Sequence, residues 1–394
     1  MSEQLRREFN ARWTPEKYER FLRMIDERAG THVAFRNCET PCFFEVRFLN
    51  DMAAAGEELI RQLVDSPEYW RLSNEAIPAR YRVPNEPHAP LFVQVDFGVI
   101  QDSEGHLHPR LVEIQGFPSL YAYQPTLSQA YIDAYELDPM LRFLFSGLDG
   151  TTYWNLLRRV VVAGHDPENV ILLEIDPRRQ KTLCDFLVTE HRLGVRAVCI
   201  TQLKREGNRL YYDREGRRVP VRRIYNRAIV DELERRGVDA PFDWRDDLDV
   251  EWAGHPNFYF RISKFSIPYL RHVTVPETIF LSDVKELPAN VADWVLKPLY
   301  SFAGLGVKVG PTREEVDQIP AANRHNWILQ QRMPFAPVIE TPEGPTKAEV
   351  RIMYIWDEKP RPVCNIIRMG RGKMMGVDHN KDMKWVGASA ALFY

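Results

Sequence analysis

The sequence lacks any hydrophobic run long enough to cross a membrane, since no stretch of about 18 consecutive apolar residues occurs. Its first residues, MSEQLRREFNARWTPEKYERF, are charged and amphipathic and do not contain the apolar core of a signal peptide. We therefore expect a cytoplasmic location and no membrane partner. No pattern in the sequence indicates an oligomeric state.

Cysteine is scarce, and its spacing argues against redox or zinc chemistry. The five cysteines form no CxxC pair and lie mostly in apolar segments, as reduced structural cysteines do. Cys38 and Cys42 are spaced loosely enough to share a metal, but no second pair of ligands accompanies them. A structural role for these thiols is the simpler interpretation.

An excess of charge of either sign is also missing. Lys and Arg number 52, Asp and Glu number 55, and the formal net charge is −3. This balance argues against nucleic acid as a partner and favours small-molecule substrates. At 394 residues, the chain exceeds the size at which one hydrophobic core usually stops growing, so two or three lobes around a cleft are expected.

Two common nucleotide signatures are absent. No GxGxxG follows the apolar run VILLEI near residue 169, and no GK[ST] of a P-loop follows the lysine of VLKPLYSFAGLGV. The first absence argues against a dinucleotide site, although residues 169–227 have the β-α-β pattern of a small Rossmann-like unit. We interpret that unit as one wall of a substrate site.

The most informative segment that is present covers residues 91–125. Two alternating stretches flank the turn at Glu104-Gly105, so the segment predicts a hairpin that brings Asp96 close to Glu113 and Gln115. Carboxylate and amide oxygens of this kind suit Mg²⁺ that bridges nucleotide phosphates. A half-solvated strand shows the same alternation, so the hairpin by itself leaves both interpretations open.

Two lysines and a loop extend the nucleotide hypothesis. Lys297 ends an apolar strand and precedes a loop with glycines, and Lys264 lies at the junction of a strand and a helix. Such lysines supply charge to phosphates, which the backbone N–H groups of a loop can approach closely. The loop residues that would cover the phosphates are Ser301, Phe302, Ala303, Gly304 and Gly306. A plain β-turn and a solvated surface lysine account for the same residues.

Two further strands carry polar residues that fit the same site. Trp327 to Gln331 is an apolar strand that ends in Gln330 and Gln331, whose amides suit the edge of an adenine at a hinge. Arg351 and Arg368 lie on a predicted antiparallel hairpin, where guanidinium groups bind phosphate or carboxylate in a bidentate way. Polar strand ends and surface arginines are the alternative interpretation.

The remaining segments divide the chain coarsely. Residues 1–80 are predicted to be mostly helical, with a helix start at Thr14-Pro15-Glu16 and a short strand between Cys38 and Phe48. A helix is expected from Leu127 to Leu148. Residues 228–256 are acidic and rich in turns, and the chain from about 257 onward has the pattern of an α+β lobe.

In their order along the chain, these pieces resemble the circularly permuted branch of the ATP-grasp superfamily, typified by the synthetase domain of glutathionylspermidine synthase. The resemblance covers roughly residues 91–394 and places Arg227 at the position of a family arginine. It implies a mixed α+β and α/β ATP-grasp fold with a small Rossmann-like pre-ATP-grasp domain. The implied division is a helical region 1–90, a metal hairpin and helix 91–150, the Rossmann-like domain 151–256, and nucleotide-binding lobes 257–394.

The resemblance also implies a function, with two departures. It indicates an ATP- and Mg²⁺-dependent ligase that joins a carboxylate to an amine through an acyl phosphate. Asp96, Glu113 and Gln115 would hold the metal; Arg351, Arg368 and Arg227 would be catalytic. However, Gln94 stands where the family has an arginine, and Gln115 where it has an asparagine. An ATP-binding protein without catalysis, or a phosphotransferase on the same fold, are the alternatives.

Overall fold

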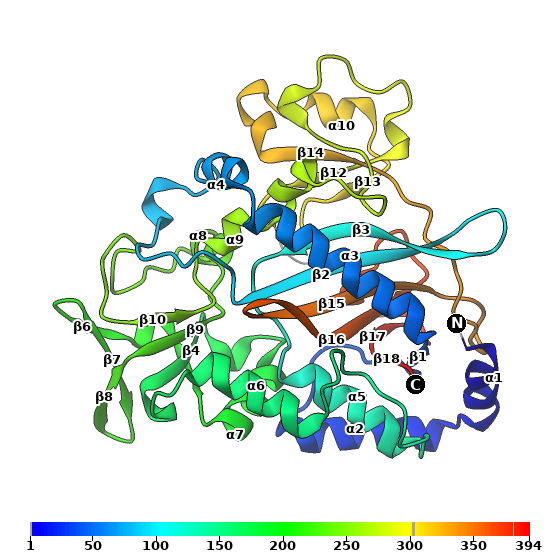
Figure 1. Ribbon diagram of the computed structural model, residues 1–394, viewed down its shortest axis with the longest axis horizontal. Helices are drawn as coiled ribbons and strands as arrows, with labels where there is room; N and C mark the ends of the chain where they lie inside the picture. The colour runs from blue at the N-terminus through cyan, green and yellow to red at the C-terminus, as the bar shows by residue number, and fades with distance from the viewer. Residues whose placement is uncertain (1, 302–303, 381) are drawn as a thin grey trace.

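The computed structural model describes residues 2–301, 304–380 and 382–394. A central antiparallel sheet has the strand order β17-β16-β15-β2-β3. Its strands are β2 (Phe92–Gln101), β3 (Leu107–Gln115), β15 (Lys347–Asp357), β16 (Lys359–Gly370) and β17 (Gly387–Ser389). The two predicted hairpins, β2-β3 and β15-β16, therefore lie side by side in one sheet, although about 230 residues separate them along the chain (Figure 1).

Several helices form from the first part of the chain, and the third of them packs against this sheet. They are α1 (Glu3–Arg12), α2 (Pro15–Ala29), α3 (Val46–Val64) and α4 (Pro67–Ser73). Helix α2 begins where predicted, with the Thr14 side chain as its N-cap and Pro15 in its first turn. Helix α3 lies across the sheet (Figure 1), and the Tyr354 hydroxyl donates a 2.8 Å hydrogen bond to the carbonyl of Ala53. Apolar side chains of α3 and of the central sheet form a core between them.

A second, parallel sheet has the order β10-β9-β4-β5. Its elements are β4 (Val170–Glu174), α7 (Leu183–Leu193), β5 (Arg196–Cys199), β9 (Arg223–Asn226) and β10 (Glu251–Ala253), with β6 (Lys204–Glu206), β7 (Arg209–Arg214) and β8 (Arg217–Val221) as an antiparallel appendage. Helices α6 (Gly150–Val162) and α8 (Val230–Arg236) complete this region. The predicted β4-α7-β5 unit is present, and its two strands are parallel neighbours.

A third sheet lies at the top of Figure 1 and has the order β11-β14-β12-β13. Its strands are β11 (Thr278–Phe280), β12 (Trp294–Pro298), β13 (Lys308–Val309) and β14 (Trp327–Gln331), with α10 (Arg313–Asp317) beside them. The backbone N–H of Leu111 donates to the Thr274 carbonyl at 2.8 Å, which attaches this lobe to the edge strand β3. The lobe therefore faces one edge of the central sheet.

Two local predictions are wrong, and one predicted strand is present but shorter than expected. The helix expected from Leu127 to Leu148 is α5 (Tyr123–Ala134), because Glu136 adopts a left-handed conformation with φ of 55° and Pro139 disfavours a helical Asp138. The strand expected between Cys38 and Phe48 is only β1 (Cys42–Phe43), which pairs with β18 (Ala391–Leu392). Lys264 follows the short helix α9 (Phe258–Arg261), not a strand, and begins a 3₁₀ helix.

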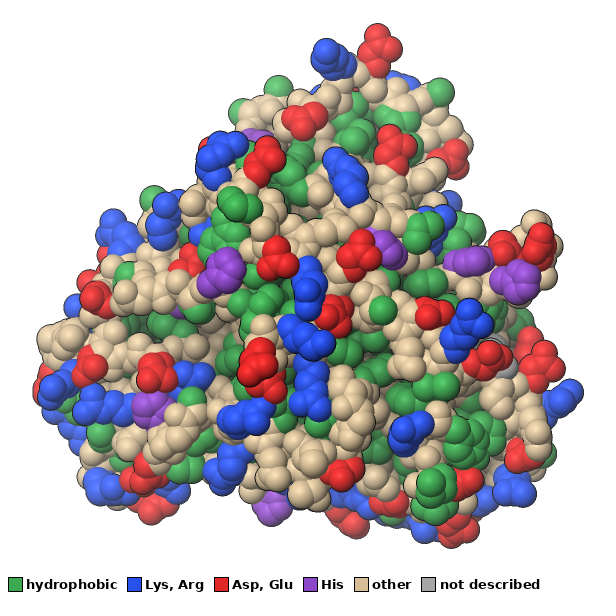
Figure 2. Space-filling model, viewed as in Figure 1, with side chains coloured by type: hydrophobic (Ala, Val, Ile, Leu, Met, Phe, Trp, Pro, Cys, Tyr) green, Lys and Arg blue, Asp and Glu red, His purple; other side chains and the backbone are tan. Residues whose placement is uncertain are grey.

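The distribution of charge on the surface agrees with the nearly balanced numbers of acidic and basic residues. On the face shown in Figure 2, Lys and Arg side chains alternate with Asp and Glu, with no large area of one sign. Within residues 2–301, 304–380 and 382–394, no helix has the length and apolar character needed to span a membrane.

Candidate functional site

A cavity of about 380 Å³ lies between the central sheet and the third sheet. Segments far apart in the chain line it. Six of the predicted site residues belong to this lining: Glu113, Lys264, Lys297, Gly304, Gln330 and Arg368. Two larger surface hollows, of about 970 and 620 Å³, contain no predicted site residue among the residues that line them. The cavity that joins the predicted residues, and not the largest hollow, is therefore the candidate site.

Lys297 lies at the end of β12 and points into this cavity from the third sheet. Its ammonium group donates hydrogen bonds to the Val112 carbonyl at 2.8 Å and to the Gln330 side-chain oxygen at 2.5 Å. Burial lowers the pKa of Lys297 to about 8, although the nearby Glu113 carboxylate opposes this shift. A buried ammonium whose hydrogen-bond partners are neutral oxygens is suited to receive an anion.

Lys264 reaches the same cavity from the other side of the cleft. Its ammonium group donates to the Ser301 carbonyl at 2.6 Å and lies 3.7 Å from the Glu113 carboxylate. The turn that carries Lys264 approaches β3 closely, because the Gly116 N–H donates to the Ile262 carbonyl at 2.7 Å. A Cβ atom at Gly116 would lie 2.7 Å from the Phe258 carbonyl, so only glycine fits there.

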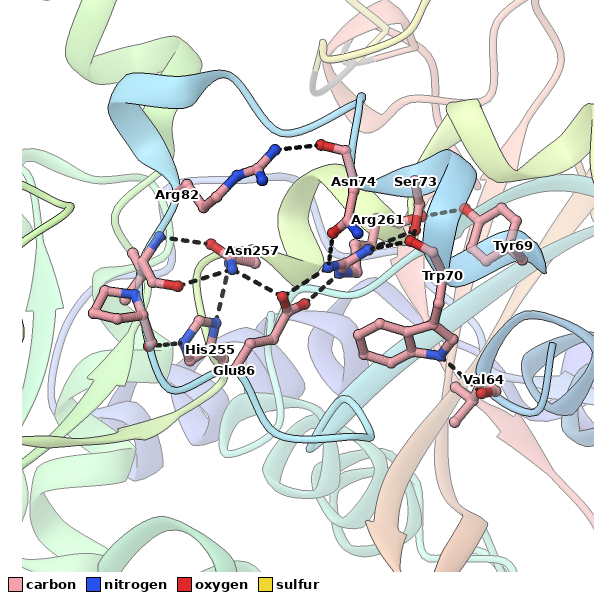
Figure 3. A network of polar contacts seen from close by, with 12 residues as sticks. Val64, Tyr69, Trp70, Ser73, Asn74, Arg82, Glu86, His255, Asn257 and Arg261 are labelled. Carbon is pink, nitrogen blue, oxygen red and sulfur yellow. Dashed lines mark hydrogen bonds and ion pairs between the residues drawn. The ribbon is translucent and has the colours of Figure 1, made fainter. Parts of the chain in front are cut away.

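A buried polar network holds that turn in place (Figure 3). The Arg261 guanidinium forms an ion pair with Glu86, donates to the Ser73 hydroxyl at 2.7 Å and lies over the Trp70 ring. The Tyr69 hydroxyl donates to the Arg261 carbonyl. Helix α4 and the linker after it thus fix the backbone only three residues before Lys264.

Asp96 lies behind the cavity and is held by both predicted arginines. Arg351 donates from Nε to Oδ1 at 2.5 Å and from Nη2 to Oδ2 at 2.7 Å, and Arg368 also donates to Oδ2. Burial by itself would raise the pKa of Asp96, but the charges of Arg351 and Arg368 outweigh it and lower the pKa to about 2. Asp96 is therefore an ionised carboxylate with both oxygens in use.

A positive charge, that of Arg351, lies next to Gln94. Its side-chain oxygen accepts a 2.8 Å hydrogen bond from Nη1 of Arg351, and its amide nitrogen donates to the Ser119 carbonyl at 2.7 Å. Arg351 pairs with Asp96 across β15 and β2, two residues along from Gln94 on the same strand. An arginine from the neighbouring strand β15 thus places a positive charge next to Gln94.

Sequence reasoning missed Glu349 as a site residue. It lines the cavity, is 6 % exposed, and its carboxylate lies 3.1 Å from Nε of Arg368. Burial raises the pKa of Glu349 to about 7, against the opposing charge of Arg368. Its position two residues before Arg351 on an alternating strand was the available signal, since such residues share a face.

The predicted metal ligands lie together, but both oxygens of Asp96 already accept hydrogen bonds from arginines. Asp96 is opposite Glu113, and Gln94 is opposite Gln115, across β2 and β3. The Gln115 amide nitrogen donates to Glu113, so its nitrogen faces that carboxylate. Across the described part of the chain, no group of three or more His, Cys, Asp or Glu is arranged to hold a metal ion.

Other predicted residues lie outside the cavity. Gln331 is exposed, because alternation on β14 turns it away from Gln330. Arg227 is buried, donates to Asp185 at 2.7 Å and lies over the rings of Phe117 and Phe186; the described lining of the cavity does not include it.

The structure describes only part of the predicted phosphate loop. Gly304 lines the cavity and adopts a positive φ of 73°, whereas Gly306, with a φ of 75°, is exposed near Pro298. The Ser301 hydroxyl is buried without a hydrogen-bond partner among the described residues. Phe302 and Ala303 lie outside the described residues.

Comparisons with known proteins show similarity at the level of the fold. No protein-family model matches the sequence, and no curated protein sequence matches it. Among solved structures, the chain is similar to a glutathione synthetase-like effector from Globodera pallida in its apo form, with a TM-score of 0.59 and 11 % identity over 96 % of each chain. At this identity the likeness concerns the fold alone: a mixed α/β arrangement consistent with an ATP-grasp-like fold.

Proposed function

We propose that the protein is an ATP-dependent ligase that joins a carboxylate to an amine through an acyl phosphate. The observation that carries this proposal is the charge of the cavity. Its lining contains six cationic side chains (Lys264, Lys297, Arg332, Lys347, Arg368 and Lys373) against the two carboxylates of Glu113 and Glu349. Such an excess attracts a polyanion, and a nucleoside triphosphate has the required charge.

The same cavity has a surface for an apolar base. Val295, Val309, Met333, Phe335 and Met374 belong to its lining. Ligand sites commonly combine such apolar and aromatic walls with a few polar groups that fix orientation. The adenine of ATP would lie against these walls, with its phosphates toward Lys264 and Lys297.

The proposed reaction needs position and charge more than a strong base. A substrate carboxylate oxygen attacks the γ-phosphorus, and the bond to ADP breaks. The amine nitrogen then attacks the acyl carbon of the acyl phosphate, inorganic phosphate leaves, and the nitrogen loses a proton. Lys264 and Lys297 would bind the phosphates of ATP, and Arg368, with Arg351 behind it, would stabilise the charge of the acyl phosphate.

Magnesium remains a prediction from the resemblance. Asp96, as observed, is not available as a ligand without displacement of Arg351 and Arg368. The roles above therefore rest on the side chains of this protein alone.

The proposal is tested by nucleotide-dependent turnover. ATP would be incubated with a panel of carboxylic acids and amines, and ADP, inorganic phosphate and the amide product would be quantified together. We expect ADP and phosphate in equal amounts only when both co-substrates are present. If saturating ATP neither raises the melting temperature nor yields ADP with any pair, the proposal fails.

A second candidate is an ATP-binding protein that has lost catalysis. Two observations favour it: Gln94 replaces an arginine of the family, and Arg227 is sequestered by Asp185. ATP binding without ADP formation would support this candidate. A phosphorylated small molecule without an amide would instead indicate a phosphotransferase.

A further inference from the structure

Arg351 and Arg368 surround Asp96, and we call this arrangement the arginine clasp. It argues against a site in which Asp96 holds a metal ion before ATP binds. Three guanidinium nitrogens, two of Arg351 and one of Arg368, donate to the two Asp96 oxygens. Charge-assisted, bidentate contacts of this kind are among the strongest hydrogen bonds in proteins. Both oxygens of Asp96 therefore have cationic partners before any ligand arrives.

Arg351 also lies where the hairpin would share a cation between its strands. Its Nη2 atom is 2.7 Å from Oδ2 of Asp96 and 3.7 Å from Oε1 of Glu113. These two carboxylates are opposite each other on β2 and β3. An ion bound by both would have to displace this guanidinium.

The local balance of charge opposes a free dication as well. Lys264, Lys297 and the two arginines face only three carboxylates, those of Asp96, Glu113 and Glu349. The cluster thus carries an excess of positive charge, which repels Mg²⁺ and attracts phosphate oxygens. The further lining cations Arg332, Lys347 and Lys373 act in the same direction.

We infer that this cavity binds a polyphosphate anion without requiring a divalent cation, because the Arg351 guanidinium already supplies positive charge between Asp96 and Glu113. The inference rests on the proposed function, in which the ligand is ATP. It goes beyond that function by assigning to a protein side chain the place that the resemblance gives to a metal. The affinity of the protein for ATP would therefore be nearly the same with and without Mg²⁺.

The wild-type protein provides the first test. Isothermal titration calorimetry would measure the Kd of ATP, and of inorganic tripolyphosphate, in excess EDTA and in excess Mg²⁺. We expect the Kd of ATP to differ by less than about threefold between the two conditions. If ATP binds at least about tenfold more tightly with Mg²⁺, the inference is overturned while the proposed function stands. If ATP binds in neither condition, both are overturned.

Variants of Arg351 provide the second test. Arg351→Gln removes the guanidinium, and we expect it to weaken ATP binding in EDTA by about tenfold or more, with part of the loss restored by Mg²⁺. Arg351→Lys retains a charge and is expected to lose less affinity. Arg47→Gln is the matched control, because the Arg47 side chain is 91 % exposed on α3.

A direct metal readout completes the design. Mn²⁺ titrations followed by electron paramagnetic resonance would report binding without nucleotide, and we expect none for the wild-type protein. Stoichiometric Mn²⁺ binding to the free wild-type protein that is lost in Asp96→Asn would contradict the inference. Because the calorimetry and the Mn²⁺ titration of the wild-type protein use the unmodified chain, they remain decisive even if Arg351→Gln does not fold.

Discussion

The central sheet and the parallel sheet each hold an arginine–aspartate pair; the first pair borders the candidate cavity, whereas the second is not among the described residues that line it. In the parallel-sheet region, the Arg227 and Asp185 side chains are 4 % and 0 % exposed, and aromatic rings lie against the guanidinium. In the central sheet, Arg368 is 22 % exposed, lines the cavity and still binds Asp96. An arginine in such a pair can therefore contact a ligand only where its surroundings leave access to it, as they do for Arg368.

The largest expected effect concerns the buried pair of the parallel sheet. Arg227→Met leaves Asp185 buried without its counter-charge, and we expect a loss of about 3–5 kcal/mol in the free energy of unfolding, measured by chemical denaturation. ATP binding by the folded fraction should be unchanged. A variant with wild-type stability but no turnover would instead support the catalytic role that the resemblance implies for Arg227.

The next effect concerns the cavity. Lys297→Met removes a buried ammonium group, and we expect ATP binding to weaken by about ten- to hundredfold, as measured by calorimetry. Stability should not fall as it does for Arg227→Met, because burial already disfavours the charged lysine. If both variants lose stability equally and Lys297→Met binds ATP normally, the contrast between the two regions is wrong.

The pH dependence sharpens the same contrast. The folded pKa of Lys297, about 8, lies below its ordinary value of 10.5, so between these values the unfolded chain binds more protons. The contribution of Lys297 to stability therefore rises as pH increases through this window. ATP affinity should change in the opposite direction and fall above pH 8 as the ammonium group loses its proton. Lys297→Met should lack this decrease.

The smallest effect is expected at Glu349. Its pKa of about 7 lies above the ordinary value of 4.5, so the folded protein holds a proton there between these values. The associated stability is present at low pH and is lost as pH rises through about 7. Glu349→Gln removes a negative charge near the phosphates, and we expect ATP binding at pH 8 to tighten by roughly two- to fivefold. A weaker affinity would indicate that the carboxylate itself contacts the ligand.

Local patterns in the sequence predicted much of the fold. The alternation around Glu104-Gly105 and between Arg351 and Arg368 identified both central hairpins, and Thr14-Pro15 identified the start of α2. The prediction that a helix continues beyond Ala134 was wrong. Apolar residues continue in the sequence there, but the backbone leaves the helical conformation at Glu136. Composition alone does not report such a change.

The sequence by itself determined which basic side chains are candidates for a phosphate site and that Lys297, Arg351 and Arg368 lie on strands, because periodicity and turn residues act over a few neighbouring positions. Only the tertiary structure decided which charges meet. The pairing of β15 with β2 places Arg351 beside Asp96, and packing of the parallel sheet encloses Arg227 with Asp185. These ion pairs join residues that are 255 and 42 positions apart in the chain, and no pattern over a few neighbouring residues encodes such contacts.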